Sequence, residues 1–248
     1  MNVLDLFSGI GGASLGLHWA GMRTVAFCEQ DPFCTAILHR HWPGVPVYPD
    51  IRRLTASTLL ADGIPPPDLI VGGFPCQDIS LAGHGAGLEG ARSGLWTHMA
   101  RLVAECRPRW VVAENVPGLR SRGADQVCAG LESQDYTVWP LVVGAVHAGA
   151  PHRRQRVWIV ARHNAPDAPG PRLETRQPQP APPPPRLRPE RRRGWPPEPG
   201  HRRVDHGLPA RVDRIKALGN AIVPANMAML ARAILASSAF SACQSGAE

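Results

Sequence analysis

The stretch Asp5-Leu6-Phe7-Ser8-Gly9-Ile10-Gly11-Gly12 joins a short apolar run to a glycine-rich loop that opens a helical pattern. Glycines in such a loop let the backbone approach a ligand closely and direct the N-terminal amides of the helix at it. Ser14 stands where the dinucleotide-binding pattern Gly-x-Gly-x-x-Gly would have its third glycine. Glu29 ends the next apolar run, where a carboxylate can accept hydrogen bonds from both hydroxyls of a ribose. Together, the loop and Glu29 favour a bound adenosyl group over an empty turn and an ordinary exposed glutamate.

Short apolar runs alternate with amphipathic stretches over residues 1–160, which is typical of a parallel sheet covered by helices. Strands are predicted at Val3–Leu6, Thr24–Cys28, Asp68–Val71, Trp110–Ala113, Val138–Val143 and Arg156–Ala161. Helices are predicted at Ala13–Ala20, Pro32–His39, Ser93–Cys106, Ala124–Ser133, Val212–Leu218 and Pro224–Ser237, with a sharp turn at Gly219-Asn220-Ala221 between the last two. The pattern predicts an α/β fold.

The chain length and composition favour one catalytic domain with a small appendage, since 248 residues leave little room for two full domains. No run approaches the roughly 20 apolar residues of a membrane helix, and the N-terminus lacks the basic head of a secretion signal. We therefore expect a cytoplasmic protein without a membrane partner. The six cysteines include no Cys-x-x-Cys pair, which argues against a metal site and a disulfide framework.

One segment concentrates both the prolines and the positive charge. Residues 165–199 hold 13 of the 27 prolines, which largely excludes regular helix or central strand. Residues 151–216 hold 16 Lys and Arg against 6 Asp and Glu, whereas the rest of the chain holds 11 against 14. This segment is either a solvated basic surface or an electrostatic contact for nucleic-acid phosphates.

Two further motifs place a thiol and a carboxyl group at the ends of predicted strands. Gly72-Gly73-Phe74-Pro75-Cys76-Gln77 follows one strand, and Glu114-Asn115-Val116 follows another. If these strands are neighbours, their ends lie only ~5 Å apart, so Cys76 and Glu114 can meet on one flat ring. That pair favours covalent addition with proton donation. A buried cysteine and a turn-capping glutamate are the alternatives.

These segments, in this order, resemble the motifs of the DNA cytosine-5 methyltransferase family. The glycine loop resembles the family's methyl-donor motif, Gly-Phe-Pro-Cys-Gln its nucleophile motif, and Glu-Asn-Val the motif of the same letters. Residues 152–156 resemble the Gln-x-Arg-x-Arg motif, with His152 in place of the glutamine, and residues 217–224 resemble the closing Gly-Asn motif. The match spans residues 1–160 and about 203–236.

The resemblance implies a Rossmann-like S-adenosylmethionine-dependent methyltransferase fold with a short, Pro/Arg-rich target-recognition insert. Residues 1–161 would form the catalytic domain, residues 162–203 the target-recognition or linker segment, and residues 204–248 a C-terminal segment whose helix packs back on the catalytic domain. Family members usually have a longer recognition region, so this chain departs from the pattern there.

The resemblance also assigns site residues. The catalytic residues would be Cys76, Glu114, Arg154 and Arg156. Residues matching the S-adenosylmethionine site are Phe7, Gly9, Gly11, Glu29, Asp50, Ile51, Pro75, Leu95 and Asn220, with Glu29 on the ribose and Asp50 on the adenine amino group. Gln30 stands where the family often has an aromatic residue for adenine stacking. No metal is expected.

The implied substrate is double-stranded DNA, from which the target cytosine must be flipped before Cys76 and Glu114 can reach it. A cognate restriction endonuclease is a further candidate partner, and the protein would act as a monomer in a prokaryotic or phage-encoded system. Three alternatives stay open: a tRNA cytosine-5 methyltransferase, a DNA-binding relative that has lost catalysis, and a nicotinamide oxidoreductase, which would leave the Pro-Cys-Gln motif unexplained.

Overall fold

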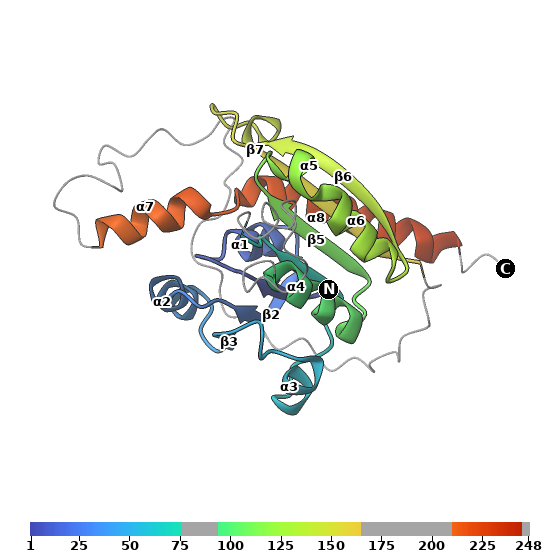
Figure 1. Ribbon diagram of the computed structural model, residues 1–248, viewed down its shortest axis with the longest axis horizontal. Coiled ribbons are helices and arrows are strands. Elements are labelled where there is room, and N and C mark those ends of the chain that lie inside the picture. The colour runs from blue at the N-terminus through green and yellow to red at the C-terminus, as the bar shows by residue number, and fades with distance from the viewer. Residues whose placement is uncertain (76–93, 165–209, 245–248) are drawn as a thin grey trace, which may run out of the picture.

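A seven-stranded sheet forms the centre of the molecule, with the strand order β3-β2-β1-β4-β5-β7-β6 (Figure 1). The computed structural model describes residues 1–75, 94–164 and 210–244. The strands are β1 Asn2–Leu6, β2 Arg23–Cys28, β3 Val47–Tyr48, β4 Leu69–Gly72, β5 Trp110–Asn115, β6 Tyr136–Gly144 and β7 Gln155–His163. The helices are α1 Gly12–Trp19, α2 Pro32–His41, α3 Ala56–Ala61, α4 Gly94–Cys106, α5 Leu119–Arg122, α6 Ala124–Glu132, the short 3-10 helix η2 Ala145–Ala148, α7 Arg211–Asn220 and α8 Pro224–Gln244.

The predicted α/β fold is confirmed. The sheet was expected to be parallel, but it is mixed. Strands β3, β2, β1, β4 and β5 are parallel, whereas β7 runs antiparallel to both β5 and β6. β6 and β7 are joined by η2 and a short loop over residues 145–154, too short for a parallel crossover, so the pair returns as a hairpin. β7 therefore comes to lie directly beside β5.

Alternating side chains along the strands build two separate cores, as the two-residue period of a strand requires. Leu4, Leu6 and Ile70 face the side covered by α3, α4, α5 and α6. Val3, Leu69 and Val71 face the opposite side, which is covered by α1 and α8. In Figure 1, α4 and α6 lie in front of the sheet and α8 crosses behind it. Because both faces are covered, the loops at the strand ends are left to form the site.

The first and last helices of the described chain pack closely against each other. Gly12 and Gly16 of α1 leave no room for a side chain, because a Cβ there would overlap the backbone oxygens of Ile222 and Pro224. Residues 211–237 are long and apolar enough by composition to cross a membrane. They form two helices, however, and the side of α8 that carries Met227 is buried against α1 and the sheet.

The turn between α7 and α8 lies slightly later than expected. Gly219 and Asn220 are the last residues of α7, and the break covers residues 221–223. Pro224 begins α8, and a residue before proline is disfavoured in the helical region, so the extended backbone falls immediately before it. The break brings the end of α7 to the carboxyl edge of the sheet.

Candidate active site

A cavity of about 750 Å³ opens at the carboxyl ends of β1, β2, β4 and β5. Of the residues predicted for donor binding, eight line it: Phe7, Gly9, Glu29, Asp50, Ile51, Pro75, Leu95 and Asn220. Glu114 and Arg156 line the same cavity, whereas Gly11 and Arg154 do not. Cys76 lies outside the described residues. The structure therefore brings most of the predicted donor residues and two of the predicted catalytic residues around one space.

The glycine loop and Glu29 are locked together by hydrogen bonds. The Gly9 amide donates to Glu29 Oε2 over 2.7 Å, and the Asp31 amide donates to Oε1 over 2.8 Å. Phe7 and Gly9 both have φ 54°, the left-handed region that is uncommon for a side chain such as Phe7. Glu29 is thus held by two backbone donors, and its remaining lone pairs are available to hydroxyl groups in the cavity.

Gly11 does not line the cavity, and its role is to shape the backbone at the start of α1. It caps the N-terminus of α1 with φ 83°, and its amide donates to the Ser8 oxygen over 2.9 Å. A Cβ at this position would come within 2.5 Å of the Trp42 ring. Glycine is required at this position by both the backbone conformation and the neighbouring ring.

A chain of buried hydroxyls explains why Ser14 replaces a glycine. Ser14 Oγ donates to Asp5 Oδ2 over 2.6 Å, and Thr24 Oγ1 donates to Ser14 Oγ over 2.7 Å. Asp5 is 1% exposed, and burial raises its pKa to about 7 against the opposing effect of the Ser14 hydrogen bond. Asp5 lines the cavity beneath the loop. Its importance was missed from the sequence, although Ser14 at a glycine position was the available signal.

Asp50 is engaged with a neighbouring arginine. The Arg52 amide and Nε both donate to Asp50 Oδ1, over 3.0 and 2.8 Å, and Arg52 Nη2 donates to Oδ2 over 3.0 Å. These contacts hold the pKa of Asp50 below its usual value, with the Arg52 hydrogen bond as the main cause. Asp50 is followed by Ile51, which is only 5% exposed and packs in the core beside α4.

Glu114 is a buried acid paired with a cation. It ends β5 next to β7, and its Oε1 lies 3.0 Å from Arg156 Nε. Glu114 is 7% exposed, and this burial raises its pKa to about 7, although the charges of Arg156 and Arg154 oppose the rise. Desolvation outweighs the cations because the carboxylate loses nearly all contact with water. Glu114 can therefore exchange a proton near neutral pH.

The next residue in β5 holds the turn that leads to Cys76. Asn115 is 3% exposed, and its Nδ2 donates to the Phe74 oxygen over 2.9 Å. Gly73 leaves no space to spare, since a Cβ there would lie 3.2 Å from Glu114 Oε2. β4 and β5 are parallel neighbours, as the convergence of their ends requires. The turn after β4 therefore begins in direct contact with the acid.

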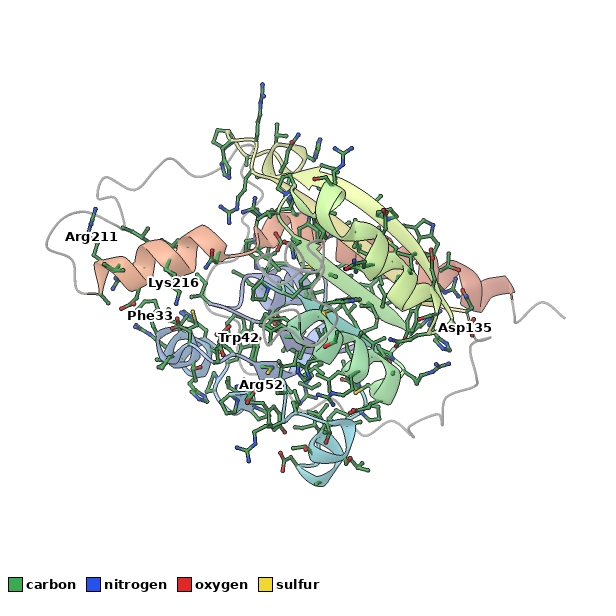
Figure 2. The ribbon with its side chains drawn as sticks, in the orientation of Figure 1. Phe33, Trp42, Arg52, Asp135, Arg211 and Lys216 are labelled. Carbon is green, nitrogen blue, oxygen red and sulfur yellow. The ribbon has the colours of Figure 1, made fainter. Side chains whose placement is uncertain are left out.

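Arg154 and Lys216 fasten α7 over the cavity. Arg154 Nη2 donates to the oxygens of Gly219 and Ala221, over 2.7 and 2.8 Å, which satisfies carbonyls at the end of α7. Burial lowers the pKa of Arg154, and the nearby Arg156 charge adds to this effect. Lys216 Nζ donates to Asp31 Oδ2 over 2.8 Å, and Figure 2 shows it extending from α7 toward α2. Both links join the C-terminal segment to the site, and neither was foreseen from the sequence.

No group of three or more His, Cys, Asp or Glu side chains suited to a metal ion occurs among residues 1–75, 94–164 and 210–244. The cavity is instead lined by carboxylates, backbone amides and apolar side chains. A pocket of this composition suits an organic ligand with hydroxyl and amino groups.

Comparison with known proteins identifies the family. Residues 1–190 match the model of the C-5 cytosine-specific DNA methylase family. The chain is 39% identical over 169 residues to Type II methyltransferase M2.BsuMI of Bacillus subtilis, covering 65% of this chain and 42% of that protein. It is 35% identical over 175 residues to Type II methyltransferase M.AquIA of Picosynechococcus, covering 64% and 70%.

The structural comparison agrees with the sequence. A prophage-encoded DNA modification methyltransferase from E. coli superposes with a TM-score of 0.56 and 31% identity, covering 66% of this chain and 47% of that one. The expected Rossmann-like methyltransferase fold is thereby confirmed. The chain spans about half the length of most curated relatives that it matches. Proteins of this family use S-adenosylmethionine as methyl donor. The chain belongs to the C-5 cytosine-specific DNA methylase family.

Proposed function

We propose that this chain methylates carbon 5 of cytosine in double-stranded DNA, using S-adenosylmethionine and a covalent adduct between Cys76 and the base. The observation that carries the proposal is the single cavity that joins the doubly anchored Glu29 to the buried Glu114–Arg156 pair. The end of the cavity at Glu29 suits a ribose, and the end at Glu114 suits a ring that must gain a proton. Two such ends in one space are what a methyl transfer between two bound molecules requires.

The donor would lie along the carboxyl edge of β1 and β2. Glu29 would accept hydrogen bonds from the ribose hydroxyls, and Asp50 would accept one from the adenine amino group once Arg52 yields part of its contact. Phe7, Ile51 and Leu95 would supply apolar surface, while Gly9, Pro75 and Asn220 would complete the wall. When bound, S-adenosylmethionine supplies an electrophilic methyl group on a sulfonium sulfur.

The protein groups would act on a flipped cytosine in sequence. The Cys76 thiolate adds to carbon 6, and the electron pair displaced toward nitrogen 3 is stabilised by a proton from Glu114. Arg156 would orient the Glu114 carboxyl through their 3.0 Å contact, and Arg154 would hold the end of α7 against the site. Carbon 5 is then electron-rich and takes the methyl group. A base then takes the carbon-5 proton, Cys76 leaves as a thiolate, and the nitrogen-3 proton returns to Glu114, which restores the aromatic ring.

The remaining parts of the proposal concern partners and organisation. Residues 1–161 would form the catalytic domain, residues 162–203 the target-recognition or linker segment, and residues 204–248 the segment that closes the donor site. A monomer in the bacterial cytoplasm would suffice for methylation. A restriction endonuclease would be a partner in the cell, because the relatives are Type II methyltransferases.

The covalent step is tested with DNA that carries 5-fluorocytosine. A base can remove hydrogen from carbon 5 but cannot remove fluorine, so Cys76 cannot be eliminated and the adduct is trapped. Wild-type protein with donor should give a methylated complex that survives denaturation and maps to Cys76. Cys76→Ser should form none, because a hydroxyl is a far poorer nucleophile near neutral pH. Cys106→Ser, which alters a half-buried cysteine of α4, is the matched control.

The outcomes separate the alternatives. Ordinary DNA methylated by wild type without any trapped adduct would refute the covalent mechanism. Methylation of tRNA in place of DNA would reassign the substrate. Donor binding without methylation of either nucleic acid would identify a relative that has lost catalysis.

A further inference from the structure

Two residues of α4, Arg101 and Glu105, are tied to the irregular segment that connects β3 to α3. Arg101 Nη2 donates to the oxygens of Ile51 and Leu54, over 2.9 and 2.7 Å. Arg101 Nη1 donates to Glu105 Oε1 over 2.6 Å, and Glu105 Oε2 accepts from the Ala56 amide over 2.9 Å. We call these two side chains the α4 clamp. It occupies three backbone groups of the segment at once.

Turn hydrogen bonds from the amides of Arg53 and Leu54 to the Asp50 oxygen also shape the segment, but they do not use the carbonyl groups of Ile51 and Leu54. Ile51 and Leu54 lie between β3 and α3, where no strand partner takes their carbonyl groups. Their side chains are 5% and 2% exposed and pack with Met99 of α4. Packing sets the approximate position of the segment, but the Arg101 contacts set the direction of its carbonyls, since hydrogen bonds are directional.

The α4 clamp joins two parts of the chain that both line the cavity. Pro49, Asp50 and Ile51 line one wall from the segment, and Leu95 and His98 line it from the first half of α4. Arg101 and Glu105 themselves do not line the cavity. The width between Ile51 and Leu95 therefore depends on side chains that lie behind the wall and do not touch its contents.

We propose that Arg101, supported by Glu105, is a positioning residue that sets the adenine end of the donor pocket. The inference rests on the proposed function, because it needs the adenosyl group to lie between Ile51 and Leu95. Arginine suits this position because its planar fork can donate to two carbonyls and a carboxylate at the same time. Lysine offers one ammonium centre and cannot reach all three in the same geometry.

The test measures the affinity of the full chain for S-adenosylhomocysteine and for the analogue in which hypoxanthine replaces adenine. Wild type should prefer the adenine compound. Arg101→Met should weaken binding of the adenine compound about tenfold, equivalent to one well-placed hydrogen bond, while binding of the hypoxanthine compound changes less. Arg101→Lys should lie between wild type and Arg101→Met. Glu105→Gln should lose less than Arg101→Met, because its amide oxygen still accepts a hydrogen bond.

Kinetics with a DNA substrate give a second readout. Arg101→Met should raise the KM for donor with little change in kcat, since the clamp does not touch the reacting atoms. Arg40→Met changes an exposed arginine of α2 and serves as the matched control. Should Arg101→Met fail to fold by circular dichroism, Arg101→Lys and Glu105→Gln carry the test.

The results distinguish the two proposals. Wild type that binds neither nucleoside compound would refute the donor site itself. Wild type that prefers adenine, together with folded Arg101 variants that keep the same affinity and the same preference, would overturn the positioning role. Equal weakening of both compounds would also overturn it, because general loosening of the fold does not discriminate between bases.

Discussion

Two buried carboxyl groups, Asp5 and Glu114, reach a pKa of about 7 in different surroundings. Asp5 accepts a hydrogen bond from the Ser14 hydroxyl, which in turn accepts one from Thr24. Glu114 is paired with Arg156. In both, loss of water contact is the largest cause of the shift. The difference lies in the partner: a neutral hydroxyl suits a structural acid, and a cation beside an open cavity suits an acid that must gain and lose a proton.

Asp5 should make the protein less stable as the pH rises. Its pKa is raised on folding from 3.8 to about 7, so the stability present below pH 4 is lost progressively as the pH approaches 7. Asp5→Asn keeps the oxygen that accepts from Ser14 but cannot ionise. We expect Asp5→Asn to equal wild type near pH 4 and to exceed it by roughly 2 to 4 kcal/mol above pH 7.

Urea unfolding of the two proteins from pH 4 to 8 measures this difference directly. Asp125→Asn, at an exposed position in the first turn of α6, provides the control. Parallel pH profiles for wild type and Asp5→Asn would show that Asp5 does not titrate in this range.

Glu114 should make methylation fall as the pH rises. Because its pKa is raised to about 7, the protonated form that can donate to nitrogen 3 is lost above that pH. Glu114→Gln should slow methylation on the order of 100-fold and remove this alkaline loss. Single-turnover rates between pH 6 and 9 test both effects, with Glu132→Gln on α6 as control. A Glu114→Gln profile that retains the alkaline loss would assign the titration to another group.

At the scale of elements, α7 is fastened to α2 by the only lysine in the chain. Lys216 is 64% exposed, so its pair with Asp31 should add less than about 1 kcal/mol to stability. The Asp31 amide also donates to Glu29, which links the pair to the proposed donor site. We expect Lys216→Ala to leave the melting temperature nearly unchanged but to speed donor dissociation a few-fold.

Stopped-flow displacement of bound donor measures that rate, with Arg232→Ala on α8 as control. Since the chain has one lysine, reaction with an amine-selective acetylating reagent gives an independent measure. Bound donor should slow acetylation of Lys216 relative to the N-terminal amine. If Lys216→Ala leaves the dissociation rate unchanged and bound donor leaves the acetylation rate of Lys216 unchanged, α7 does not restrict the pocket.

Helices and strands long enough to repeat their apolar spacing could be predicted from the sequence. Very short elements and the order of the strands in the sheet could not. The six predicted strands and six predicted helices are present, and their ends differ by at most two residues, except that α8 continues seven residues beyond the predicted end at Ser237. β3 has two residues and α3 has six, so neither repeats a pattern often enough to stand out. The placement of β7 between β5 and β6 depends on pairing across the sheet, which local periodicity does not specify.

The same limit applies to the site. The loop, Glu29 and Glu114 could be located because each follows a strand, and the strand ends share one edge. Arg101 and Lys216 could not, since their partners lie 47 to 50 and 185 positions away and only the folded chain brings them together. Cys76 remains a prediction from its motif.

At the scale of the whole molecule, the positive charge is concentrated in one region of the chain. Residues 151–216 carry 16 Lys and Arg against 6 Asp and Glu. Replacing residues 163–202 by a neutral Gly-Ser linker should weaken binding to duplex DNA and flatten its dependence on salt, while donor affinity stays unchanged. For about four neutralised phosphates, wild-type affinity should fall on the order of 100-fold between about 50 and 200 mM salt.

Fluorescence titrations with a labelled duplex, and calorimetry with S-adenosylhomocysteine, check the two halves of this prediction. A linker variant with the wild-type salt dependence would place the phosphate contacts on residues outside 163–202. A variant that loses donor binding would show that the replaced segment supports the catalytic fold.

The glycine contacts between α1 and α8 impose an order on biosynthesis. Gly12 and Gly16 are matched to backbone at residues 222–224, which is synthesised some 200 positions later. While the chain is still being translated, the outer side of α1 has no neighbour, and α7 has not yet closed the pocket. The nascent polypeptide therefore cannot complete the cavity until α7 and the start of α8 have been synthesised. If the proposed function holds, a chain terminated before residue 211 should therefore be inert toward DNA, because it lacks α7 and α8.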